Sequence, residues 1–165
     1  MVNMEAVAVA QAEIVDIRTD IPDPLDFPWP FEDGSVKELT CSGVLEYIPG
    51  KLRSRFMDEV YRILAPDGKA AFAVPYWNTW HAIADYRLEW PPLCEQSFLY
   101  FNKGWREVNK IETDMVCDLH FTYGYTCEPE TAARNEESRS FYIKHYTNCV
   151  DMLHLMLTKH PPVIS

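Results

Sequence analysis

The stretch from residue 29 to residue 76 constrains the fold most, because it contains a strand, a helix and a second strand with a turn at each junction. Val36–Ser42 is a short β-prone run that follows Asp33-Gly34, a dipeptide typical of turns. Between residues 52 and 64, apolar side chains recur every three or four positions with charged ones between them, which predicts an amphipathic helix.

The sequence Ala65-Pro66-Asp67-Gly68 should end that helix, since proline cannot continue a helix and glycine permits a reversal of the chain. Residues 69–75 then form a largely apolar run, which suits a strand buried on both faces of a parallel sheet. A strand, helix and strand of this length predict a βαβ crossover.

Further elements are expected on both sides of this unit. Before it, residues 5–17 favour a strand ending near 14–17, and the proline-rich stretch after it predicts a loop across the end of the sheet. After it, residues 95–108 predict a helix interrupted at Gly104. Two alternating runs, residues 115–125 and the sequence NCVDMLHLMLT, predict an antiparallel strand pair at the sheet edge, with a short exposed excursion at residues 129–138.

Composition limits the function. Residues 1–165 are expected to form one domain, since 47% hydrophobic and 13% aromatic content suffices for a core. A formal net charge of −10 opposes attraction to nucleic-acid phosphates, so a small molecule or a protein is the expected partner. No apolar run is long enough for a membrane span and the first residues do not resemble a secretory signal, so we expect a cytoplasmic protein.

The five cysteines are odd in number and form no CxxC pair, which favours reduced thiols over a disulfide framework or a zinc site. Cys117, His120 and Cys127 could in principle converge on a metal, but buried thiols and a hydrogen-bonded histidine are the simpler interpretation. We assign no metal.

Two sequences in this order, FPWPFEDGSVKELTCSGVLEYI and FMDEVYRILAPDGKAAFAVPY, resemble the class I S-adenosylmethionine (SAM)-dependent methyltransferases of the methyltransferase type 11 group, including small phage-encoded members. The match covers roughly residues 14–76, and the later FLYFNKGWRE and the strand pair extend it over most of the chain. The resemblance implies a Rossmann-like α/β sheet, mostly parallel with an antiparallel C-terminal strand pair. It also implies SAM, or its product S-adenosylhomocysteine (SAH), across the carboxyl ends of the strands.

The resemblance also implies a set of cofactor-binding residues. An acidic residue that closes an early strand takes the ribose hydroxyls, which suits a carboxylate because it can accept two hydrogen bonds. The adenine is contacted by an acid, for which two positions remain open, and by the apolar residue after it. The end of the next strand faces the methyl donor. In that order the residues are Asp16; Asp23 or Asp26, with Phe27; and Ser42, Gly43 and Val44.

The chain departs from the family in one major and two smaller features. Family members carry a glycine-rich loop after their first strand, whereas this chain has no glycine before Gly34, so we expect a truncated sheet that lacks the central strand and its loop. In the phage-type pattern, a histidine commonly stands at the positions of Gly43 and Tyr47. The turn that precedes the strand at residues 69–75 usually has a second glycine, where this chain has Asp67. Without the central strand, backbone N–H and C=O groups on the neighbouring strands must form hydrogen bonds with another element or another subunit.

Two functions follow as hypotheses. One is a methyltransferase-like protein that binds SAM or SAH and methylates a small molecule or a protein. The other is a degenerate, noncatalytic relative that forms oligomers or binds a host protein. No catalytic residue can be assigned, because methyl transfer mainly requires alignment of the acceptor. His81 is a candidate base, since imidazole titrates near neutral pH, although a packed or exposed histidine is the simpler interpretation.

Overall fold

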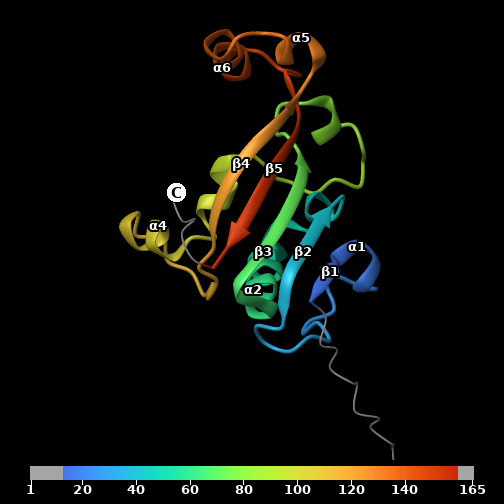
Figure 1. The fold of residues 1–165 in the computed structure, drawn as a ribbon, viewed down its shortest axis with the longest axis vertical. Coiled ribbons are helices and arrows are strands. Elements are labelled where there is room, and N and C mark those ends of the chain that lie inside the picture. The colour runs from blue at the N-terminus through green and yellow to red at the C-terminus, as the bar shows by residue number, and fades with distance from the viewer. Residues whose placement is uncertain (1–12, 160–165) are drawn as a thin grey trace, which may run out of the picture.

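The computed structural model describes residues 13–159, which form one five-stranded sheet in the order β1-β2-β3-β5-β4 (Figure 1). The first three strands pair in parallel, and β5 runs antiparallel to both β3 and β4. The mixed α/β sheet and its antiparallel C-terminal pair are confirmed. The strands are β1 (Ile14–Asp16), β2 (Val36–Ser42), β3 (Leu64–Pro75), β4 (His120–Cys127) and β5 (Val150–Thr158).

Helices connect these strands. The βαβ unit expected from the sequence is present, with α2 between β2 and β3. The α-helices are α1 (Ile17–Asp20), α2 (Arg53–Ile63), α3 (Glu95–Leu99), α4 (Lys103–Val108), α5 (Pro129–Ala132) and α6 (Glu136–His145). Three 3₁₀ turns lie at Leu45–Tyr47, Gly50–Leu52 and Trp80–Ala82.

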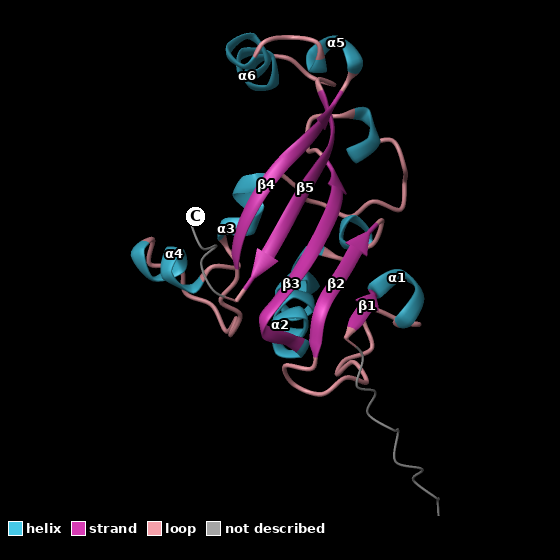
Figure 2. Ribbon diagram, in the orientation of Figure 1, coloured by secondary structure: helices cyan, strands magenta, loops and turns pink. Residues whose placement is uncertain are grey.

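The core lies on one face of the sheet, where α2 and α3 pack (Figure 2). The apolar stripe of α2 is fully buried there, as its spacing predicts, at Phe56, Met57, Val60 and Ile63. Phe98 of α3 is also fully buried, with its ring 6.4 Å from that of Phe72 on β3. Aromatic pairs at such distances add to the burial of apolar area.

The other face of the sheet is open within residues 13–159. Apart from Met156, its side chains are small or polar, and those of β2, β4 and β5 are exposed while the alanines of β3 are half-buried. They surround a shallow hollow of about 400 Å³. A sheet with parallel central strands is normally covered on both faces. The residues that point to this face include Thr40, Ser42, Ala71, Ala73, Thr122, Gly124, His154 and Met156.

The structure corrects the boundary at the start of β3. This strand begins at Leu64, which pairs with Val36, and pairing resumes only at Lys69, opposite Glu38. The intervening turn residues therefore form a bulge instead of a separate loop. Gly68 is required there because a Cβ atom at this position would lie 2.8 Å from the carbonyl oxygen of Val36.

Two other sequence expectations were wrong in position. The break in the helix at 95–108 falls before Lys103 and not at Gly104, because Asn102 Oδ1 accepts the Trp105 amide and starts α4. The strand expected from residue 115 begins only at His120. Residues 115–117 are held instead by side chains, since Asp58 Oδ1 accepts the Val116 and Cys117 amides at 3.0 and 2.8 Å.

At the start of the chain, the expected strand is present as β1, and Ile17 already belongs to α1. The part of that expectation that concerns residues 5–12, and with it the missing glycine-rich loop, lies outside the described residues. Between residues 13 and 159, none of the helices combines the length and the apolar character that a membrane span requires.

Candidate functional site

The carboxyl ends of β1, β2 and β3 meet at one edge of the sheet, and two of the sequence-predicted groups lie there. Asp16 ends β1 opposite Thr40, and Ser42 ends β2 opposite Ala73. Open α/β sheets generally bind their ligands at this edge. Asp16 and residues 42–44 are thus close enough to contact one ligand.

Asp16 has a free carboxylate oxygen. Its Oδ1 accepts the Arg18 amide at 3.0 Å and so caps α1, and its own amide donates to Asp20 Oδ2 at 2.8 Å. Within the described residues, Oδ2 has no hydrogen-bond donor, and the side chain is half-buried. One oxygen is therefore held by the protein while the other can accept a hydrogen bond from a ligand hydroxyl.

Gly43 leaves room for a ligand beside the end of β2. Its φ is +69°, a conformation that favours glycine, and a Cβ atom built there would meet nothing within 4 Å. The backbone of this residue can therefore be approached closely from outside. Together with the free oxygen of Asp16, this open backbone fits a nucleoside-type ligand lying across the ends of β1 and β2.

The two predicted adenine-binding acids lie in an exposed turn that follows α1. Asp23 Oδ1 accepts the Leu25 amide at 2.9 Å, and the Asp23 carbonyl accepts the Asp26 amide at 3.1 Å. Phe27 is half-buried against α2, with the Arg55 guanidinium 4.9 Å from its ring centroid. These contacts show a structural use for Phe27, and its role toward adenine stays a prediction.

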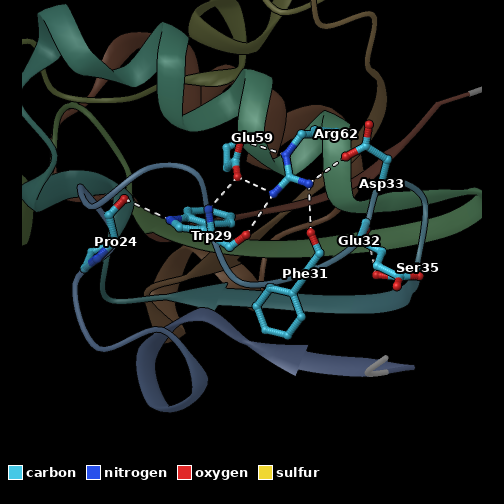
Figure 3. Close-up of polar contacts among 8 residues, drawn as sticks. All are labelled: Pro24, Trp29, Phe31, Glu32, Asp33, Ser35, Glu59 and Arg62. Carbon is cyan, nitrogen blue, oxygen red and sulfur yellow. Dashed lines mark hydrogen bonds and ion pairs between the residues drawn. The ribbon is translucent and has the colours of Figure 1, made fainter. Parts of the chain in front are cut away.

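A single arginine fixes the loop that leads from this turn into β2 (Figure 3). Arg62 uses all five N–H donors: two on the Glu59 carboxylate, two on the Trp29 and Phe31 carbonyls, and one on the Asp33 carboxylate. Glu59 Oε1 also accepts the Trp29 amide at 2.7 Å. The proline-rich loop is therefore rigidly attached to α2.

A second arginine attaches the segment that covers the end of β3. Arg53 is 5% exposed and donates to the carbonyls of Ile48, Glu89 and Pro91 at 3.0, 2.9 and 2.5 Å. The backbone of Gly50 also packs closely against this segment, because a Cβ atom at Gly50 would lie 2.6 Å from the Trp90 carbonyl oxygen. The segment from Trp77 to Leu93 is thus held over the carboxyl edge.

This covering segment buries Glu46, which follows β2. Glu46 is 9% exposed, and its Oε2 has no hydrogen-bond partner among the described residues. Burial raises the pKa of this carboxyl group, and the nearby Arg53 only partly opposes the shift. An acid in such a position costs folding free energy when it is ionised.

We expect Glu46→Gln to stabilise the protein near neutral pH. Because the folded-state pKa is raised, the wild-type chain gains stability from a protonated Glu46 only at acidic pH and loses it as pH rises through the folded-state pKa. The midpoint of thermal unfolding should therefore be higher for the variant at pH 7, and the difference should shrink below about pH 4, near the ordinary pKa of glutamate. A lower midpoint at pH 7 would show that ionised Glu46 stabilises the fold.

His81 lies beside the end of β3, in the 3₁₀ turn Trp80–Ala82. Its Nε2 is 3.2 Å from Asp151 Oδ1, at the start of β5. Two half-exposed indoles precede it in sequence, with Trp77 at 50% and Trp80 at 55% exposure. The sequence predicted a possible base at His81, but it gave no sign of its carboxylate partner.

Comparisons with known proteins agree with this geometry. Residues 3–72 match a family described as "Methyltransferase domain". A SAM-dependent methyltransferase from Archaeoglobus fulgidus superposes with a TM-score of 0.54 at 10% identity, covering 82% of this chain and 64% of that protein. The chain has the fold of a SAM-dependent methyltransferase. The resemblance stated from the sequence, to the class I methyltransferases, is thereby confirmed.

Other structures with the methyltransferase fold superpose less well. One is a SAM-dependent methyltransferase from Mesorhizobium loti, with a TM-score of 0.43 at 14% identity, covering 82% of this chain and 66% of that one. Another is phosphoethanolamine N-methyltransferase 2 of Haemonchus contortus in complex with phosphomonomethylethanolamine and SAH, with a TM-score of 0.45 at 12% identity. That superposition covers 82% of this chain and 36% of the Haemonchus protein. This chain spans 64% of the Archaeoglobus protein, which is less than two thirds of its length. A search of curated proteins gives no significant match.

Proposed function

We propose that this chain binds SAM and its product SAH across the carboxyl ends of β1 and β2, and transfers the methyl group to a small-molecule or protein acceptor. The observation that carries the proposal is the coincidence of Asp16 Oδ2, free to accept a ribose hydroxyl, with the open backbone at Gly43. Both lie at the edge where sheets of this kind bind nucleotides. The match of residues 3–72 to methyltransferases supports it.

Charge supports the expected class of acceptor. The formal net charge of −10 opposes nucleic acid, and the carboxylates of Asp85, Asp151 and Glu46 lie in or beside the segment that covers the site. Asp85 stays ionised, because Arg87 lowers its pKa to about 2. We therefore propose a neutral or cationic acceptor.

We expect Asp16→Asn to weaken binding of SAH by about tenfold. Asparagine keeps the cap on α1, since it caps helices as well as aspartate does, but it removes the charge and one of the acceptors for a ribose diol. Calorimetric titration of the variant with SAH, beside the wild type, measures the loss. The matched control is Asp67→Asn, an exposed aspartate in the bulge of β3, which should bind SAH unchanged. Equal affinity of the Asp16 variant and the wild type would remove Asp16 from the site.

A second function is favoured by one observation, the open face of the sheet. Small and polar side chains over four strands, around a hollow of about 400 Å³, form a surface that a second copy of the chain could cover. In this alternative the fold serves as an interaction module without catalysis, and a homo-oligomer is its expected form. Light scattering on the purified chain distinguishes the two, because a monomer at micromolar concentration contradicts the interaction module.

A further inference from the structure

The chain between β4 and β5 forms an excursion at the carboxyl edge of the sheet. β4 ends at Cys127 and runs in the same direction as β3, because β5 is antiparallel to both. Residues 128–149, with α5 and α6, therefore lie beyond the edge at which β3 ends (Figure 1). β4 stands three strand spacings, or about 14 Å, from β2, so the excursion is separate from the site at Asp16 and Gly43.

The excursion contains an open pocket of about 610 Å³, a size typical of small-molecule sites. Its lining comes from α5 and the turn after it, from the end of α6, and from the residues before β5. The Glu128 amide donates to the Cys149 carbonyl at 3.1 Å, which joins the two ends of the excursion. Arg139 Nη2 donates to the Arg134 carbonyl at 2.9 Å, which attaches α6 to the turn after α5.

Asn148 attaches the same pocket to the rest of the carboxyl edge. Its φ is +57°, a left-handed conformation that is uncommon for a residue other than glycine. Its Oδ1 accepts the Trp80 amide at 2.8 Å, and its amide donates to the Asn78 carbonyl at 3.2 Å. The pocket is therefore held in place by contacts within the chain before any ligand binds.

Two hydrogen-bond donors of this pocket have no partner within residues 13–159. Thr131 is 4% exposed, and its hydroxyl forms no hydrogen bond there. None of the guanidinium N–H groups of Arg134 forms one either, and its Nε is fully buried. The guanidinium lies instead on the Tyr142 ring, 3.5 Å from its centroid, a contact that fixes the plane of the group without using its donors. An acceptor supplied by a ligand would satisfy both side chains.

Two carboxylates line the same pocket. Glu128 and Glu130 stand on either side of Pro129 at the start of α5, and within the described part of the chain neither side chain forms an ion pair or a hydrogen bond. An anion in this pocket would be repelled by the two carboxylates, and a cation by the Arg134 guanidinium. A ligand that carries both charges a few bonds apart satisfies all three groups.

Two tyrosine rings give the pocket an apolar surface. Tyr142 and Tyr146 lie one helical turn apart at the end of α6, with ring centroids 4.8 Å apart, and Tyr146 is 51% exposed. Aromatic rings of this kind bury the apolar part of a ligand while their hydroxyl groups remain in water. The pocket thus combines unpaired charges of both signs with an aromatic wall.

We propose that the pocket between α5 and α6 binds a small zwitterion, of which a free α-amino acid with an apolar side chain is the simplest example. The carboxylate of the ligand accepts hydrogen bonds from the Arg134 guanidinium and the Thr131 hydroxyl. Its ammonium group pairs with Glu128 or Glu130, and its side chain packs on the tyrosine rings. This binding does not depend on SAM or on the proposed function.

NMR titration of the isotope-labelled chain with L-phenylalanine and two analogues tests the proposal. The analogue 3-phenylpropionate lacks the ammonium group, and 2-phenylethylamine lacks the carboxylate. We expect L-phenylalanine to bind at least about tenfold more tightly than either analogue, because each analogue leaves one charged partner unpaired. The amide signals that shift should be those of residues 128–149.

Replacing Arg134 with methionine should remove the contact with the carboxylate. Methionine keeps an apolar stem against the Tyr142 ring but carries no charge. Binding of L-phenylalanine should weaken about tenfold, whereas binding of 2-phenylethylamine should not weaken. The matched control is Arg55→Met, since Arg55 also lies on an aromatic ring, 4.9 Å from the centroid of Phe27, but outside this pocket. That variant should bind L-phenylalanine as the wild type does.

The other polar groups have their own variants. The double variant Glu128→Gln, Glu130→Gln should weaken binding of L-phenylalanine and should not weaken binding of 3-phenylpropionate. Thr131→Val should weaken L-phenylalanine a few-fold without lowering the midpoint of thermal unfolding, because it replaces an unpaired buried hydroxyl with a methyl group of the same shape. A lower midpoint with unchanged affinity would remove Thr131 from the site.

Four results would overturn the proposal: no binding of L-phenylalanine at millimolar concentration, equal affinity for L-phenylalanine and either analogue, shifts confined to residues outside 128–149, or unchanged affinity of Arg134→Met. The three probes decide on the wild-type chain alone if a variant is poorly folded. All samples lack SAM and SAH, so failure here leaves the proposed function untouched, and failure to bind SAH leaves this site untouched.

Discussion

Replacing Arg62 with alanine should lower the free energy of unfolding by about 3 kcal/mol, the lower end of the cost of leaving one partner of a buried ion pair alone, because the Arg62 side chain is 26% exposed. The Glu59 side chain is only 11% exposed and would be left with the Trp29 amide as its remaining donor among the described residues. The Trp29 and Phe31 carbonyls would lose their donor as well. Chemical denaturation with urea measures the change.

The matched control is an exposed ion pair. Lys37 Nζ lies 2.9 Å from Glu13 Oε1, and the two side chains are 59% and 76% exposed, so Lys37→Ala should leave the free energy of unfolding nearly unchanged. Arg62→Lys should fall between the two, because an ammonium keeps the charge but lacks the planar fork that reaches five acceptors. An Arg62→Ala loss no larger than that of Lys37→Ala would show that the loop is held by other contacts.

Replacing Arg53 with methionine should release the covering segment from the carboxyl edge. Three carbonyl groups, of Ile48, Glu89 and Pro91, would lose a charged donor, at about 1–3 kcal/mol for each group left unsatisfied. Water can reach some of them once the segment opens, so we expect a net loss of about 3 kcal/mol. Amide hydrogen exchange should become faster at residues 88–93.

This prediction also has a control on the same side-chain type. Arg18 is exposed on α1, and Arg18→Met should change neither stability nor hydrogen exchange at residues 88–93. If the Arg53 variant keeps the exchange rates of the wild type in this segment, the cover is held by its aromatic and proline contacts instead.

Local sequence signals predicted the elements that carry their own start and stop residues. The bounds of β2 follow from Asp33-Gly34 and its β-prone run, and the apolar spacing of α2 matches its buried face. The predictions were wrong where hydrogen bonds to distant side chains, and not the local sequence pattern, determine the backbone conformation. Residues 115–117 alternate like a strand, but the Arg106 guanidinium donates to the Cys117 carbonyl, and Asp58 accepts two amides there, so no strand forms.

The site was predictable only in part, for a similar reason. Asp16 and residues 42–44 end strands, so the edge they share follows from the order of elements. Asp151, by contrast, sits in an ordinary alternating strand, and nothing in the sequence places it opposite His81. That contact depends on the register of β5 with β3 and on the left-handed Asn148, both of which arise only in the folded chain.

The most direct test of the account is calorimetric titration of the purified chain with SAM and, separately, with SAH. A site formed by the free oxygen of Asp16 and the open backbone at Gly43 predicts binding of both compounds in the micromolar range, with a raised midpoint of thermal unfolding. The absence of heat and of thermal stabilisation with either compound, at protein concentrations that detect weak binding, would contradict a cofactor site at this edge.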